Sequence, residues 1–172
     1  AARPRLVDSR RALLAALQEV KGLFVVGSHY SPARTREAAA ILADLGTPLL
    51  IHQPSYSMLN RHVEDPAHED AYDGVQTESL LDVVGDLGVG TIVFSPLQQG
   101  LLTDRYLSGS APEGSRAARP DSPFLSEKNL DETYLERARA LNEIAGARGP
   151  PRAPLALSGV LRAARVPAAR GG

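Results

Sequence analysis

Apolar residues recur along this chain in two patterns, one typical of helices and one typical of buried strands. Leucine, alanine and valine repeat every three or four positions within residues 10–20, which predicts a helix with one face on a core. The same spacing predicts three more helices: residues 32–45, 77–88 and 128–148. Three short runs consist mainly of apolar residues, many of them β-branched, which predicts strands buried on both faces: Leu23–Gly27, Pro48–His52 and Thr91–Ser95.

The expected helix ends carry their own signals. Ser31 followed by Pro32 predicts an N-cap and a first helical residue. Gly46 predicts the end of that helix, because glycine adopts the left-handed conformation that closes a helix without strain. The next helix is expected to have Thr77 as its cap and to end near Gly88.

Helices and strands alternate in this prediction, which indicates right-handed βαβ units and a parallel sheet. Two long loops follow the second and third strands, from Gln53 to Gln76 and from Pro96 to Ser126. Both loops leave the C-terminal ends of strands, the edge at which α/β proteins bind ligands. A functional site is therefore expected in these loops.

Polar residues lie at the end of each apolar run or directly after it. They are Ser28 and His29, then His52 and Gln53, then Ser95. On neighbouring parallel strands such residues converge on one surface, where neutral donors and acceptors suit a small ligand with amide and phosphate groups. The alternative is that they only cap the strand ends.

The loop after the third strand has further features of a phosphate site. Its sequence PLQQG, residues 96–100, places backbone N–H groups beside a glycine, and Arg105 and Arg116 follow. Arginine side chains match phosphate oxygens well, so the loop suits a pyrophosphate or phosphomonoester. A solvated loop without a ligand is the alternative.

Composition excludes several classes of function. The chain has 172 residues, of which 43% are hydrophobic and 23% charged, with a net charge of -1. This is ordinary globular composition, and it gives no reason to expect a nucleic acid or a membrane surface as partner. There is no cysteine, which excludes disulfides, thiolate zinc sites and a cysteine nucleophile. No targeting segment is visible, so a cytoplasmic location is expected.

Three histidines, His52, His62 and His68, lie near several carboxylates. Their spacing matches no ordered set of metal ligands, so a hydrated loop is expected and no metal. The sequence also lacks a G-x-S-x-G turn, and its GVG precedes a strand rather than following one. A hydrolase elbow and a dinucleotide fingerprint are thereby excluded.

Several segments together resemble the aldo-keto reductases, especially the bacterial branch related to potassium-channel β subunits. They include IHQPSY, FSPLQQGLLT and SRAAR, followed by NLDETYLERARALNEIAGARG. The resemblance runs from about Arg10 to Arg165 and implies part of a (β/α)₈ TIM barrel, about strands five to seven with their helices. A complete barrel needs at least about 200 residues, so 1–172 is expected to be a single, incomplete oxidoreductase domain.

The resemblance implies an NADPH site. Ser28 and Gln53 match the family's ligands of the nicotinamide carboxamide, and Phe94 matches the aromatic residue that stacks on the nicotinamide ring. His29 stands where the family usually has Asn, Ser or Arg. Its imidazole keeps a hydrogen-bond donor but extends a different distance from the backbone.

The resemblance also implies a pyrophosphate loop. In it Gln98 replaces a small residue, which is expected to crowd the loop, and Arg105 and Arg116 match basic contacts to the phosphates. The remaining matches to the loop are Ser95, Pro96, Leu97 and Gly100. The wall of the substrate pocket is expected to include Tyr30, Tyr56 and Asn60.

The implied activity is NADPH-dependent reduction of an aldehyde or ketone to an alcohol. The family's catalytic Asp, Tyr, Lys and His lie on its first four strands, before the part represented here. This chain is therefore expected to hold only the cofactor-orienting half and to be poorly soluble and inactive alone. Its expected partners are a small carbonyl substrate and a missing N-terminal barrel half. The alternatives are a non-catalytic NADPH-binding or regulatory module and an inactive truncated fragment.

The C-terminal residues 149–172 depart from the family pattern and are expected to form a divergent tail. Three prolines within residues 150–154 disfavour the start of a helix. Gly159 fills a position that usually holds a large aromatic residue. No eighth strand is expected after Val166, where the chain reads VPAARGG.

Overall fold

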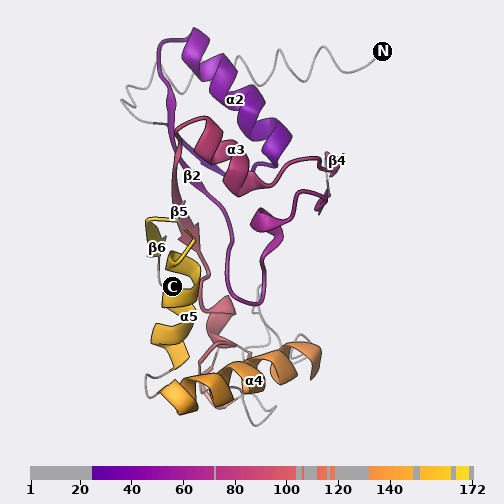
Figure 1. Cartoon of the computed structure of the whole chain (residues 1–172), viewed down its shortest axis with the longest axis vertical. Coiled ribbons are helices and arrows are strands. Elements are labelled where there is room, and N and C mark those ends of the chain that lie inside the picture. Colours follow the sequence, from indigo (N-terminus) through magenta and orange to yellow (C-terminus); the bar gives the residue numbers. More distant parts are fainter. Residues whose placement is uncertain are drawn as a thin grey trace. The chain divides into compact units, whose positions relative to one another are not determined.

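A computed structural model describes the backbone of most of the chain (Figure 1). The chain divides into two compact units, the first formed by Ala1–Pro54 and His62–Ile92 and the second by Ser55–Arg61 and Val93–Gly172. The helix expected within residues 10–20 lies outside the described residues, as do Arg105 and Arg116. The described residues are 25–71, 73–103, 106, 112–115, 117–118, 132–148, 152–163 and 166–170.

Three parallel strands occur where the apolar runs predict them. They are β1 (Val25–Ser28), β2 (Leu49–Gln53) and β5 (Gly90–Phe94). β2 lies between the other two and pairs in parallel with each of them. The parallel arrangement confirms the βαβ interpretation of the alternating pattern.

Helix α2 (Pro32–Asp44) joins β1 to β2 and packs against β2. The side chain of its N-cap Ser31 accepts a hydrogen bond from the backbone N–H of Arg34 at 3.2 Å, as expected of a serine before proline. Gly46 follows the helix with φ 73°. Both predicted ends of this helix are confirmed.

Helix α3 (Leu80–Asp86) begins later than predicted. Its N-cap is Ser79 and not Thr77, because Ser79 and Asp82 bond to each other reciprocally: Ser79 Oγ accepts from the Asp82 backbone N–H at 3.1 Å and donates to the Asp82 carboxylate at 2.7 Å. A carboxylate three residues after a serine cap satisfies two groups at once. Gly88 ends the helix with φ 67°.

The loop between β2 and α3 contains short elements that periodicity did not predict. They are η1 (His62–Glu64) and the antiparallel pair β3 (Glu69–Asp70) and β4 (Gly74–Val75). η1 packs against α3, and its central Val63 is fully buried. Val63 therefore helps to anchor this loop against α3.

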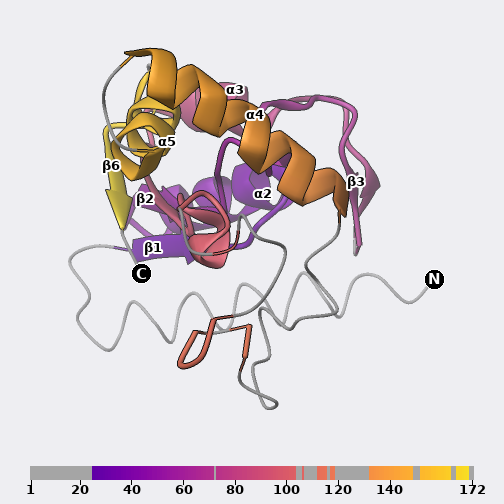
Figure 2. The same ribbon diagram turned by 90° about the horizontal axis from the view of Figure 1, so that it is seen from below.

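The second unit is built on an apolar cluster beneath η2 (Gln98–Gly100), α4 (Glu132–Arg148) and α5 (Arg152–Leu161). Figures 1 and 2 show α5 turned sharply away from the direction of α4. On α4, Leu135, Ala138 and Ala145 are buried, at the helical spacing that the sequence predicted. The cluster consists of Leu59, Leu101, Leu102, Tyr106, Ala117, Leu135 and Ala156.

The C-terminal segment is more regular than its sequence suggests. α5 begins at Arg152, directly after two prolines, so the expectation that prolines prevent a helix here was wrong: proline is tolerated in the first turn, where no intrahelical N–H bond is lost. Strand β6 (Ala168–Arg170) follows the buried Val166, and the sheet order is β1-β2-β5-β6. A strand is thus present where none was expected.

Gly159 on α5 has a specific packing reason. A Cβ atom at this position would lie 2.7 Å from the sulfur of Met58, much closer than van der Waals contact. Met58 packs against the apolar cluster, so the absence of a side chain at Gly159 lets α5 approach the segment after β2. A large aromatic residue does not fit there.

Candidate functional site

In the first unit, β1 and β2 end side by side. Ser28 is the register partner of Gln53, one at the end of each strand. His29 follows directly, exposed, in the left-handed conformation with φ 58°, and Tyr30 is half-buried. The structure therefore brings together the backbones of two predicted carboxamide ligands; the side chain of Ser28 is not among those that the structure describes.

His52 is in the core of the first unit and not at the strand ends. It is fully buried, and because side chains alternate along a strand it faces away from Gln53. Neither ring nitrogen has a hydrogen-bond partner among the described residues, and the same holds for the hydroxyl of Thr91, its register partner on β5. The prediction that His52 joins the polar strand ends was wrong.

The charge state of His52 follows from this burial. The pKa of His52 is lowered to about 4, mainly by burial and to a smaller extent by the nearby His29, while the backbone of Tyr30 offsets part of the effect. The Tyr30 ring meets the imidazole edge to face, with centroids 6.5 Å apart. His52 is therefore neutral at pH 7 and supports the position of Tyr30.

In the second unit, the loop after β5 has an unusual backbone. Ser95, Gln98 and Gln99 all have positive φ, at 54°, 48° and 57°, and Gly100 follows at 101°. Such conformations cost roughly 1–3 kcal/mol for residues other than glycine and occur most often at functional sites. The sequence carried no signal for the three non-glycine positions.

Short hydrogen bonds hold this loop. The backbone N–H of Gln98 donates to the carbonyl of Ser95 at 2.9 Å, and the side chain of Gln99 donates to Ser95 Oγ at 2.9 Å. The backbone N–H groups of Gly100 and Leu102 both donate to the Leu97 carbonyl. Pro96 is buried, and Leu97 packs against the apolar cluster.

The segment after β2 lies beside this loop within the same unit. Ser55 forms a parallel bridge with Phe94, and the Tyr56 backbone N–H donates to the Phe94 carbonyl at 3.2 Å. Ser57 Oγ donates to Gln98 Oε1 at 2.7 Å. Phe94 and Asn60 are half-buried, whereas Tyr56 is 4% exposed.

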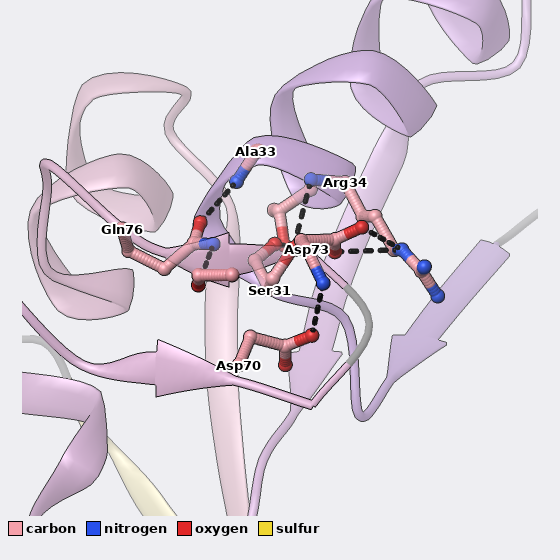
Figure 3. Close-up of polar contacts among 8 residues, drawn as sticks. Ser31, Ala33, Arg34, Asp70, Asp73 and Gln76 are labelled. Carbon is pink, nitrogen blue, oxygen red and sulfur yellow. Dashed lines mark hydrogen bonds and ion pairs between the residues drawn. The ribbon is translucent and has the colours of Figure 1, made fainter. Parts of the chain in front are cut away.

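A clasp of polar residues fastens the rest of the β2–α3 loop to the start of α2 (Figure 3). The Asp73 carboxylate accepts from Ser31 Oγ and pairs with Arg34 Nε at 2.7 Å. Gln76 Oε1 accepts from the Ala33 backbone N–H at 3.4 Å. The clasp binds the loop to Ser31, the residue that directly follows Tyr30. The sequence patterns did not predict the clasp.

Two histidines of this loop lie near each other. His62 and His68 lie 5.0 Å apart between ring centroids, and burial together with His68 lowers the pKa of His62. In the part of the chain that the structure describes, no three histidine or carboxylate side chains are placed to hold a metal ion. None of the described helices has the length and apolarity to cross a membrane.

Comparison with known proteins agrees with this arrangement. The model of the aldo/keto reductase family matches residues 25–169. The chain belongs to the aldo/keto reductase family. It is 43% identical over 161 residues to an L-glyceraldehyde 3-phosphate reductase of Escherichia coli O157:H7, covering 92% of this chain and 43% of the relative.

A second aldo/keto reductase relative is a probable voltage-gated potassium channel subunit beta of Arabidopsis thaliana, 32% identical over 76% of this chain and 37% of its own length. A solved structure, the glycerol dehydrogenase AKR11B4 from Gluconobacter oxydans, matches with a TM-score of 0.61 and 22% identity, covering 96% of this chain and 45% of that one. The fold of the family is a (β/α)₈ barrel, and the chain spans less than half the length of these relatives.

Proposed function

We propose that this chain is the part of an aldo/keto reductase that holds NADPH while an aldehyde or ketone is reduced to an alcohol. The observation that carries the proposal is the loop after β5, in which Ser95, Gln98, Gln99 and Gly100 all have positive φ. A strained backbone persists only when its surroundings enforce it, and such sites bind ligands or catalyse reactions.

The residues at the strand ends fit the two polar parts of this cofactor. A carboxamide has one acceptor and two donors, which a serine hydroxyl and a glutamine amide complement; Ser28 and Gln53 are register partners at the end of β1 and β2. The loop after β5 is proposed to hold the diphosphate. Phe94 supplies an aromatic face for the nicotinamide ring, and Arg105 and Arg116 are proposed to contact the phosphates.

NADPH, when bound, supplies the hydride that reduces the carbonyl carbon. The residues of this chain bind and orient the dinucleotide, and Tyr30, Tyr56 and Asn60 are proposed to line the pocket beside it. None of them is assigned a proton transfer. The proton for the carbonyl oxygen is proposed to come from a residue of an N-terminal barrel half that joins this chain, in a cytoplasmic protein.

The first test is a titration of the 172-residue chain with NADPH, followed by cofactor fluorescence. We expect saturable binding that is weaker than that of an intact reductase, and we expect Gln53→Leu to weaken it. Glu136→Gln, an exposed position on α4, is the matched control and leaves binding unchanged. Absence of NADPH binding by the unaltered chain contradicts the proposal.

Activity is the second test. The chain alone is expected to show no carbonyl-dependent oxidation of NADPH with glyceraldehyde 3-phosphate, the aldehyde in the name of the E. coli relative. Turnover by the chain alone contradicts the view that the catalytic residues lie outside it.

A non-catalytic regulatory module is the second candidate, and the 32% identity to a potassium channel subunit beta supports it. The two candidates differ in the fate of NADPH once it is bound. Oxidation of NADPH with an aldehyde, measured on the longest product of the gene, supports the reductase. Binding with no oxidation across a panel of aldehydes and ketones supports the module or an inactive fragment.

A further inference from the structure

The hydroxyl of Ser57 is fully used by its surroundings. Ser57 is completely buried, and its Oγ accepts hydrogen bonds from the backbone N–H groups of Leu59 at 3.2 Å and Asn60 at 3.0 Å. A hydroxyl has two acceptor positions and one donor. Both acceptor positions are occupied, so the one remaining bond of Ser57 is a donation.

This donation determines how the amide of Gln98 is turned. Ser57 Oγ lies 2.7 Å from Gln98 Oε1, and only the carbonyl oxygen of an amide accepts. The opposite orientation, with the amide nitrogen toward Ser57, would place two donors face to face. The NH₂ group of Gln98 therefore points away from Ser57, and because Gln98 is only half-buried its two donors are accessible.

The backbone of Gln98 places these donors within the strained loop. Gln98 has φ 48° and is followed by Gln99 at 57° and Gly100 at 101°, the segment proposed to bind the diphosphate. No carboxylate occurs in residues 93–103. An amide held in one direction in such a loop is suited to phosphate oxygens.

We propose that Gln98 is a further nucleotide-binding residue: its side-chain NH₂ donates to the diphosphate of the bound dinucleotide, and Ser57 sets its direction. This inference rests on the proposed function. It also changes the interpretation of the large side chain at this position, because Gln98 adds a donor to the loop while Ser57 keeps its bulk in place.

The test compares four forms of the chain, the unaltered protein, Gln98→Met, Gln98→Glu and Ser57→Ala. Methionine keeps the length of glutamine and removes both hydrogen-bonding groups, whereas glutamate still accepts from Ser57 but places a negative charge near the phosphates. Binding of NADPH and ADP-ribose, which contain a diphosphate, is compared with binding of reduced nicotinamide mononucleotide, which does not. Far-UV circular dichroism and thermal unfolding report on the fold.

We expect Gln98→Met to weaken the binding of NADPH and ADP-ribose roughly tenfold or more, since a hydrogen bond to a charged oxygen is lost. Gln98→Glu is expected to weaken the binding of both ligands further. This loss of affinity should become smaller at higher salt, because salt screens the repulsion. Ser57→Ala, which releases the direction of the amide, has a smaller effect. The mononucleotide, which keeps one of the two phosphates, is expected to lose less affinity than NADPH and ADP-ribose do.

Two results overturn the inference while the proposed function stands. One is unchanged affinity of Gln98→Met for NADPH, measured on a chain that does bind NADPH. The other is an equal loss for the mononucleotide, because Gln98 would then act only by holding the loop. Failure of the unaltered chain to bind NADPH is a different outcome, which overturns the proposed function and this inference with it.

Discussion

In the first unit the loop after β2 is held to α2 by an ion pair, whereas in the second unit the loop after β5 is held by neutral hydrogen bonds. Asp73 pairs with Arg34 and bonds Ser31 in the first case; Ser57 bonds Gln98 in the second. A carboxylate beside the proposed phosphate site would repel the ligand, which a neutral bond does not. Each loop is thus held by the type of polar contact that suits its surroundings: an ion pair in the first unit and neutral hydrogen bonds in the second.

The cores of the two units differ in a related way. The first unit buries His52 with no hydrogen bond to either ring nitrogen among the described residues, whereas the second unit contains no histidine and buries the non-titrating Ser57 and Ser115 beside its apolar cluster. A buried imidazole makes stability depend on pH, and a hydrocarbon core does not. Changes of pH and of core packing should therefore affect the two units differently.

The largest expected effect is a loss of stability of the first unit in mild acid. The folded pKa of His52 is about 4, below its ordinary 6.5, so the unfolded chain binds the proton first. Stability is complete above pH 6.5 and falls by about 3 kcal/mol as the pH approaches 4. Hydrogen exchange in β2 and α2, compared with α4, measures this difference.

His52→Leu is the decisive variant for that prediction. It removes the titrating group, so the slope of stability between pH 6.5 and 4 should flatten in β2. The control is His62→Gln, since burial also lowers the pKa of His62 and its removal should flatten a smaller part. An unchanged slope in His52→Leu contradicts the assignment.

The second largest expected loss of stability comes from overpacking the second unit. Gly159→Val places two methyl groups where a Cβ alone would lie 2.7 Å from the Met58 sulfur, and we expect a loss of about 1–3 kcal/mol in urea unfolding. Met58→Ala in the same chain should recover much of the loss. Equal destabilisation of the single and double variants would mean that Met58 is not the obstacle.

Breaking the clasp should have a smaller effect on the first unit. Asp73→Ala removes the carboxylate that pairs with Arg34, and Ser31→Ala removes the helix cap; each is expected to cost about 1–2 kcal/mol. The double variant should cost less than the sum, because each single variant already loses the hydrogen bond between Ser31 and Asp73. Arg36→Ala at an exposed ion pair with Glu78 is the control, where solvent screening leaves a smaller effect.

The smallest expected effect is a gain. Gly146 lies inside α4, and a Cβ there would meet nothing within 4 Å. Gly146→Ala should therefore stabilise the second unit by about 0.5–1 kcal/mol, because alanine favours the helix more than glycine does. Thermal unfolding measures the gain, and a loss of stability would mean that the added methyl group displaces a neighbour.

Much of the local structure could be predicted from the sequence. The strands β1, β2 and β5 and the helix α2 depend on uniform apolar runs and on Ser31 and Gly46, which act over a few residues. The cap of α3 was misplaced by two residues because Ser79 acts together with Asp82. The α5 helix was missed because prolines that break a helix interior are harmless in its first turn.

The candidate site could likewise be predicted only in part. Family resemblance pointed to Ser28, Gln53 and the PLQQG loop, and the register of β1 and β2 places Ser28 opposite Gln53. The sequence could not predict the left-handed backbone at Ser95, because that conformation is imposed by bonds to residues elsewhere in the loop. The location of His52 in the core also depends on which face of β2 the helices cover.

By itself the sequence determined the family, the alternation of helices and parallel strands, and the residues at the strand ends, because periodicity and short motifs carry that information. Only the tertiary structure decided that Ser57 orients Gln98, that Asp73 fastens its loop to α2, and that Gly159 admits Met58. Each of these contacts joins residues about 40 or more positions apart, and hydrogen bonding and close packing between distant segments depend on geometry that no local pattern encodes.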